Sequence, residues 1–76
     1  RYANAQFMLG VMYRFGTGVP EDNVLASMWW NLAAAQGNEN AQENKDIVEQ
    51  RMTREQIAEA QRLSTEWLEA HPPSGN

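Results

Sequence analysis

Apolar residues recur every three or four positions in four stretches of the chain, which is the spacing of one face of an α-helix. These stretches predict helices over residues 3–15, 23–36, 39–50 and 54–70. Residues 16–20 read Gly-Thr-Gly-Val-Pro, in which the glycines suit left-handed backbone and the proline prevents helix continuation. The pattern therefore predicts an all-α fold of four helices.

Residues that commonly cap helices stand at the predicted boundaries. Asp22 is placed to cap the second helix, because its carboxylate can accept hydrogen bonds from free backbone N–H groups. Thr53 and Gln56 have the spacing of a capping box for the fourth helix. Gly37 suits the residue that ends the second helix. The capping residues support the boundaries that the apolar pattern gives.

The apolar stripes predict which faces are buried. The first helix is expected to use Ala5, Leu9, Met12 and Tyr13, the second Ala26, Trp29 and Ala33, and the fourth Ile57, Ala60, Ser64, Trp67 and Leu68. Gly10 lies inside a helix, at a cost of about 1 kcal/mol relative to alanine, so we expect a Trp ring to pack over it. Adjacent Trp29 and Trp30 could also form a ligand-stacking platform, but packing is the favoured interpretation because Trp buries so much area.

The start of the first helix recurs later in the chain. Ala5-Gln6 returns as Ala41-Gln42, a spacing of 36 residues, and a period in this range is typical of solenoids of paired helices. The chain is therefore predicted to be an α–α superhelix of two stacked antiparallel hairpins. Residues 1–37 would form one complete repeat and residues 38–71 a degenerate C-terminal capping hairpin, whose outer face is polar. Residues 72–76 are expected to be a disordered tail.

Charge narrows the classes of partner. The 76 residues carry a net charge of −4, and after Gly37 eight Asp and Glu residues face four Lys and Arg residues. An acidic chain without a basic stripe argues against nucleic acid and anionic membranes as partners, since both require neutralisation of phosphate. No apolar run approaches the roughly 18 residues of a membrane span.

The chain offers little catalytic chemistry. It has no cysteine and a single histidine, His71, which has no credible serine partner among Ser27, Ser64 and Ser74. The glycine-rich residues 16–20 precede Glu21 and Asp22, which would repel a phosphate. Glu39, Glu43 and Asp46 share a helix face, which implies no more than loosely bound surface cations. The sequence thus predicts no enzyme activity, cofactor or structural metal.

A set of residues at fixed spacing resembles the Sel1-like repeat, a relative of the tetratricopeptide repeat. They are Ala5-Gln6, Leu9-Gly10, Tyr13, Gly16, Gly18-Val19, Asp22, Ala26, Trp29, Ala33-Ala34, Gly37 and Ala41-Gln42. The resemblance covers the first hairpin and the start of the second. It implies a non-catalytic scaffold or adaptor that holds proteins or peptides, with the first helix of each hairpin lining the concave side of a right-handed superhelix. A few such proteins have been described as hydrolases, which the missing nucleophile–base pair argues against here.

The resemblance also indicates a candidate binding surface. Once the family's core positions are removed from the first helix, four residues remain on one stripe, and the repeat period places four more on the third helix. The eight residues are Asn4, Met8, Val11, Phe15, Asn40, Asn44, Ile47 and Arg51. Apolar side chains rimmed by amides suit a peptide-binding groove. The alternative is that these residues pack against a neighbouring helix or serve the curvature of the solenoid.

A second functional hypothesis concerns the side of the first hairpin that has no neighbour. Tyr2, Phe7 and Trp30 are expected to need cover from a preceding repeat or from a second copy of the chain. We therefore expect the C-terminal end of a longer array that binds a protein or peptide. The alternative is a self-association element that forms homo-oligomers through this N-terminal face.

Overall fold

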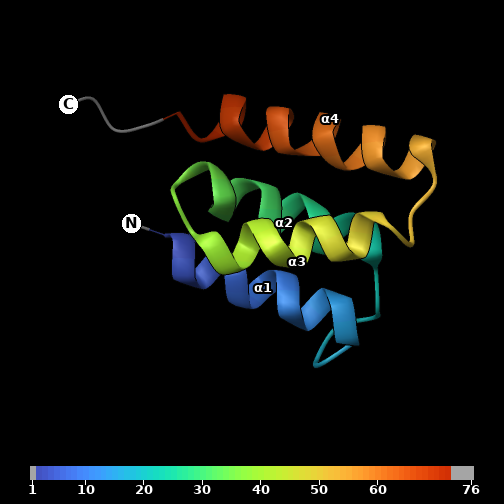
Figure 1. The fold of residues 1–76 in the computed structure, drawn as a ribbon. Helices are drawn as coiled ribbons and strands as arrows, with labels where there is room; N and C mark the ends of the chain where they lie inside the picture. The colour runs from blue at the N-terminus through green and yellow to red at the C-terminus, as the bar shows by residue number, and fades with distance from the viewer. Residues whose placement is uncertain (1, 73–76) are drawn as a thin grey trace.

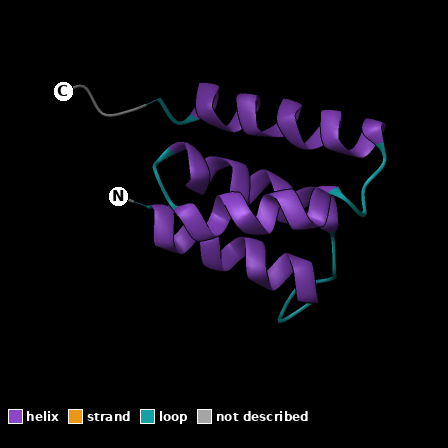
Figure 2. Cartoon of the chain, viewed as in Figure 1, coloured by secondary structure: helices purple, strands orange, loops and turns teal. Residues whose placement is uncertain are grey.

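The computed structural model describes residues 2–72, and these form four helices without a strand (Figure 2). The helices are α1 (Ala3–Phe15), α2 (Asn23–Ala35), α3 (Glu39–Glu49) and α4 (Arg54–Ala70). All four predicted helices are confirmed, and α2 and α3 each end one residue earlier than predicted. Of the predicted tail, Pro72 has no regular secondary structure, and residues 73–76 lie outside the described part.

Successive helices run in opposite directions, so that α1 and α3 point one way and α2 and α4 the other (Figure 1). α2 packs extensively against α1, α3 and α4, and α1 touches α3 along a short stretch. α3 and α4 are consecutive but scarcely in contact. The prediction of two stacked helix hairpins is confirmed, with α2 as the helix against which all the others pack.

The residues predicted to connect α1 and α2 end the first helix and begin the second. Gly16 adopts a left-handed conformation with φ of 69°, which ends α1. The backbone N–H of Asp22 donates to the carbonyl of Tyr13 at 2.8 Å, which ties the start of α2 to the end of α1. The Asp22 carboxylate accepts from the N–H of Leu25 at 3.0 Å, as predicted for a helix cap.

The later helices begin with side-chain caps as well. Asn38 accepts from the N–H of Ala41 at 2.9 Å and starts α3. Thr53 accepts from the N–H of Gln56 at 3.0 Å, and the Gln56 side chain accepts in return from the N–H of Thr53 at 2.9 Å. The predicted capping box is therefore confirmed.

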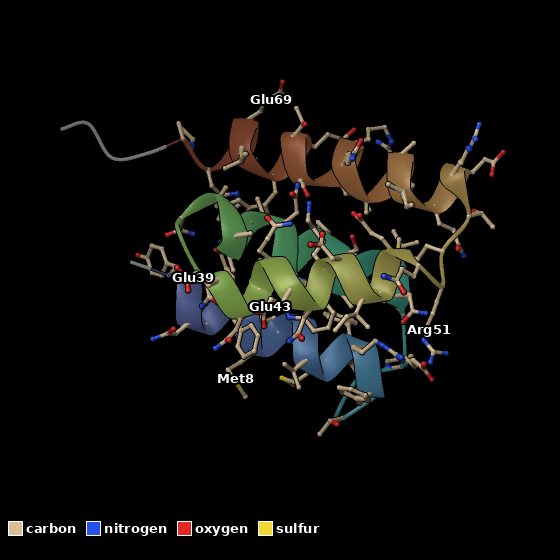
Figure 3. All side chains as sticks on the ribbon, in the orientation of Figure 1. Met8, Glu39, Glu43, Arg51 and Glu69 are labelled. Carbon is tan, nitrogen blue, oxygen red and sulfur yellow. The ribbon has the colours of Figure 1, made fainter. Side chains whose placement is uncertain are left out.

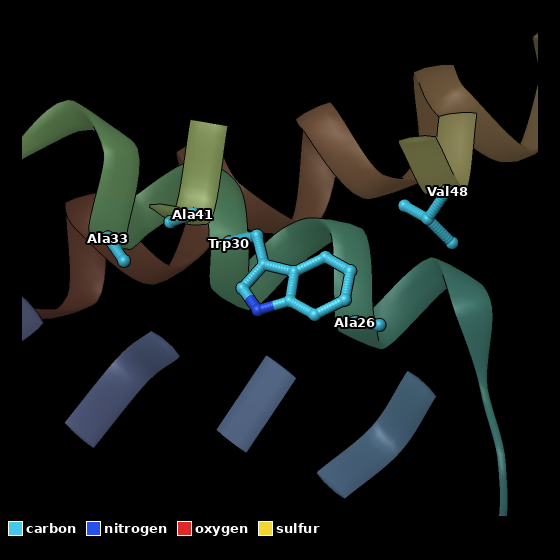
Figure 4. Close-up of a cluster of buried hydrophobic side chains, with 5 residues drawn as sticks. All are labelled: Ala26, Trp30, Ala33, Ala41 and Val48. Carbon is cyan, nitrogen blue, oxygen red and sulfur yellow. The ribbon is translucent and has the colours of Figure 1, made fainter. Parts of the chain in front are cut away.

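The core lies between α2 and α3 and is covered by α1. Five buried residues form it, and Figure 4 shows them: Ala26, Trp30, Ala33, Ala41 and Val48. Trp30 is 2% exposed, and its Nε1 donates to the carbonyl of Phe7 at 3.1 Å. The prediction that Trp29 belongs to the inner stripe was wrong. Consecutive helix residues lie about 100° apart, so the two rings point in different directions, and the space above Gly10 is filled by Trp30.

The buried face of α1 also differs from the predicted stripe. Gln6 and Gly10 are its buried residues, whereas Ala5 is exposed. Gln6 can be buried because its side-chain oxygen accepts a hydrogen bond from the amide of Gln36, the residue that follows α2. Tyr13 packs against the core as predicted.

The buried residues that α4 contributes to its contact with α2 are small. Ala60 and Ser64 are buried, and the Ser64 hydroxyl donates to the carbonyl of Ala60 at 2.9 Å. Small side chains allow two helices to approach closely. Leu68, which was predicted to face inward, lies outside this contact and is 47% exposed.

Candidate binding surface

α1 and α3 lie side by side and present the eight residues predicted from the repeat period. We call Asn4, Met8, Val11, Phe15, Asn40, Asn44, Ile47 and Arg51 together the α1/α3 surface. Six of them are exposed, and Val11 and Asn44 are half-buried. In Figure 3, Met8 projects from α1 near Glu43 of α3, and Arg51 lies at the other end of the same side. Whether this surface binds a partner stays a prediction.

The α1/α3 surface is unusually apolar for exposed positions. Met8 is 54% exposed, Phe15 67% and Ile47 56%. Val11 packs against the core cluster, so it joins this surface to the rigid interior. The guanidinium of Arg14 lies 5.1 Å from the ring centroid of Phe15 and also pairs with Glu21 at 3.5 Å. The apolar side chains are therefore presented on a fixed support.

The polar groups of the α1/α3 surface are not engaged elsewhere in the described part of the chain. No hydrogen bond among residues 2–72 involves the side-chain amides of Asn4, Asn40 or Asn44. Each amide can both donate and accept a hydrogen bond. They can therefore bind the backbone of an approaching chain.

A second apolar feature opens on the other side of α1. A hollow of about 330 Å³ is lined by Tyr2, Ala5, Gln6, Leu9, Trp29, Trp67 and His71, and we call it the Trp29 hollow. Leu9 and Val11 are two residues apart and so project about 200° apart around α1, which separates the hollow from the α1/α3 surface. The prediction of an open apolar side was wrong about Trp30, which is buried. Trp29 and Leu9 line this side instead.

Aromatic rings form one wall of the Trp29 hollow. Trp29 meets Trp67 edge-on, with centroids 5.9 Å apart, and this contact joins α2 to α4. Trp67 is stacked on His71 at 4.1 Å, and the Nδ1 of His71 lies 2.9 Å from the carbonyl of Trp67. The one histidine of the chain is therefore held against the end of its own helix.

The described residues do not assemble a catalytic site. Ser64 donates its hydroxyl to a backbone carbonyl and Ser27 is buried, while Ser74 lies outside residues 2–72. Within that range, no three His, Cys, Asp or Glu residues are grouped so that they could hold a metal ion. None of the helices in the described part is both long and apolar enough to span a membrane.

Sequence reasoning did not connect the acidic residues of α3 with the α1/α3 surface. Glu39 and Glu43 were interpreted only as a weak cation site, yet Figure 3 places both beside this surface. Glu43 stands four residues before Ile47, so the two are neighbours on α3. This spacing could have shown that the apolar centre has an acidic border.

Antiparallel helix hairpins stacked through a shared core define a helical-repeat protein. A family model described as the Sel1 repeat matches residues 3–38, and this part of the chain is a Sel1-like repeat. Repeats of this family generally mediate protein–protein interaction and generally lack catalytic activity.

The fold extends the likeness beyond the matched repeat. A protective antigen present in uropathogenic Escherichia coli strains, whose crystal structure displays an SLR fold, is 35% identical and superposes with a TM-score of 0.87. The comparison covers 93% of this chain, and so includes most of α3 and α4, but only 15% of the antigen's chain. No curated protein matches the chain.

Proposed function

We propose that the chain is a non-catalytic interaction module that binds a protein or peptide segment on the α1/α3 surface. The observation that carries this proposal is the exposure of Met8, Phe15 and Ile47 on two adjoining helices. None of the three belongs to the buried core cluster. Full burial of a large apolar side chain contributes about 1.5–3 kcal/mol, so cover by a partner would stabilise a complex.

The absence of α4 from this side supports the same proposal. α4 packs on the far side of α2 and does not cover the α1/α3 surface (Figure 1). The alternative, that the eight residues pack against another helix, applies to Val11, which packs against the core cluster, whereas six of the eight are exposed. The resemblance assigns the first helix of each hairpin to the concave side. These first helices are α1 and α3, which carry the α1/α3 surface.

The test uses two substitutions on the surface and one away from it. Met8→Asp combined with Ile47→Asp places two charges among the exposed apolar residues of the surface without touching the core, and Leu68→Asp places one charge on an exposed apolar position of α4. Affinity capture from cell lysate, quantified by mass spectrometry, should retain partners with the unsubstituted chain and with Leu68→Asp. Loss of those partners only with the double variant supports the proposal. Equal capture by all three proteins would refute it, provided that circular dichroism shows equal helicity.

A second candidate function is self-association through the Trp29 hollow. The hollow exposes parts of Leu9, Trp29 and Trp67, and a neighbouring repeat or a second copy of the chain could cover it. Sedimentation at micromolar concentration tests this, with Ala5→Arg as the variant that fills the hollow from an exposed position. A dimer that Ala5→Arg dissociates supports self-association, and a monomer at every concentration removes it.

A further inference from the structure

The charges along the α1/α3 surface are unequally distributed. α3 carries Glu39, Glu43, Asp46 and Glu49 but only one lysine. The ion pairs among residues 2–72 join Arg14 to Glu21 and Arg62 to Glu59 and Glu66, so none of them neutralises α3. Glu39 lies in the first turn, where a carboxylate favours the helix dipole, but Glu43 lies beyond the reach of that effect. The helix dipole therefore accounts for Glu39 but not for Glu43.

The opposite end of the surface is basic. Arg51 follows α3, is exposed and takes part in no ion pair within residues 2–72. Glu39 and Glu43 lie in the first two turns of α3 and Arg51 follows its last turn, so these two carboxylates and this cation lie at opposite ends of the surface (Figure 3). The surface therefore distinguishes the two ends of a bound chain.

The polar and apolar groups between these ends fit an extended segment. An extended backbone leaves N–H and C=O groups unpaired, and the amides of Asn4, Asn40 and Asn44 can satisfy them. A helical segment pairs those groups internally and would have no use for the amides. An α-helix rises about 1.5 Å per residue, so the surface measures about 18 Å along the axis of α3 from Glu39 to Arg51. An extended chain of about six residues covers that length.

We infer that the α1/α3 surface binds an extended segment of about six residues that is basic at one end, apolar in the middle and acidic at the other. The basic side chains lie at Glu39 and Glu43, and the apolar ones cover Met8, Val11 and Ile47. A carboxylate lies at Arg51. This inference rests on the proposed function, because it specifies the chemistry of the partner at the same surface. Because the two ends of the surface carry opposite charges, they fix the direction in which a segment binds. They also disfavour segments that would place a like charge at either end.

The experiment selects peptides from a random heptapeptide library displayed on phage, using the full chain as bait. The unsubstituted chain should enrich peptides with Lys or Arg at one end, apolar residues in the middle and an acidic residue at the other end. Glu39→Lys combined with Glu43→Lys should replace the basic end of the selected peptides with an acidic one. The matched control combines Glu55→Lys with Glu69→Lys, which makes the same charge change on exposed positions of α4. It should leave the selected pattern unchanged.

Further variants separate failure of this inference from failure of the proposed function. If enrichment of the peptides requires Met8 and Ile47, but the charge at their ends does not change with Glu39→Lys and Glu43→Lys, the inference is overturned. The proposed function is then left standing. Enriched peptides with apolar residues three and four apart overturn the extended conformation, because that spacing marks a helix. Enrichment that survives Met8→Asp with Ile47→Asp, or no enrichment at all, overturns both.

Discussion

The indole of Trp30 occupies the space where a side chain at Gly10 would lie. A Cβ on Gly10 would overlap the Nε1, Cδ1 and Cε2 atoms of the ring. The same Nε1 donates a hydrogen bond to the carbonyl of Phe7, so the ring is fixed in place and cannot easily move aside. The glycine therefore allows α1 and α2 to approach, and its cost to the helix is offset by the burial of a Trp.

Gly10→Ala should consequently destabilise the chain, although alanine is the better helix former. Overpacking costs typically about 1–3 kcal/mol, which exceeds the gain in helix propensity of about 1 kcal/mol when the ring cannot relax. Urea unfolding followed by circular dichroism measures the change. In a Trp30→Leu background the same substitution should cost less, and an equal cost in both backgrounds would show that the clash is not with Trp30.

Asp22→Ala should lower the free energy of unfolding by about 1 kcal/mol, the usual contribution of a helix cap. The Asp22 side chain accepts from Leu25 N–H, and alanine leaves that donor without its partner. Asp22→Asn is the matched control, because the amide oxygen can still accept. In thermal unfolding, the melting temperature of the Asp22→Asn variant should lie close to that of the unsubstituted chain and above that of Asp22→Ala. If Asn were as damaging as Ala, the charge rather than the hydrogen bond would be the source of stability.

Ala60→Leu should separate α4 from α2. Ala60 is 2% exposed at the contact between these helices, and a larger side chain there costs about 1–3 kcal/mol. Ala58→Leu, at an exposed position of the same helix, should change stability by less than about 0.5 kcal/mol. Trp fluorescence reports the separation, because Trp67 contacts Trp29 across the two helices. Identical spectra and melting temperatures for both variants would contradict the described packing of α4.

Ion pairing on the outer face of α4 should give a small stability that depends on pH and salt. Hydrogen bonding to Arg62 lowers the pKa of Glu59 from its ordinary value, and the same contact raises the pKa of Arg62. A lowered carboxyl pKa stabilises the fold above the range in which an unfolded Glu titrates. That contribution is lost as the pH falls through the pKa of the folded state.

Arg62→Met removes these pairs and should therefore lower the melting temperature at neutral pH and low salt. The difference from the unsubstituted chain should shrink at pH 3 and in 1 M NaCl, since both groups are exposed and screened. Differential scanning calorimetry at the two pH values and the two salt concentrations measures this. A difference that persists at pH 3 in high salt would point to lost packing of the Arg62 stem.

The helices and their caps were predictable because their causes are local. Asp22, Thr53 and Gln56 act within one turn of chain, and the glycine at position 16 is required by the conformation of a single residue. The 36-residue period then predicted that hairpins stack, since equivalent residues must occupy equivalent places. The exposure of Met8 and Ile47 also agrees with positions taken from that period.

The choice between neighbouring residues was not predictable in the same way. Trp29 and Trp30 are chemically identical, and which one enters the core depends on the rotation of α2 against α1. Burial of Gln6 depends on its partner Gln36, which is 30 positions away in the sequence. The packing of α4 on α2 instead of α3 likewise follows from contacts between distant segments, which no local pattern specifies.

The central place of α2 has a consequence for how the chain unfolds. Without α2, the remaining helices share little beyond the short contact between α1 and α3, so neither hairpin should persist while the other melts. Helical arrays often lose structure unit by unit. In this chain every helix packs against α2, so we expect a single cooperative unfolding transition. Far-ultraviolet ellipticity and indole emission should then report the same midpoint.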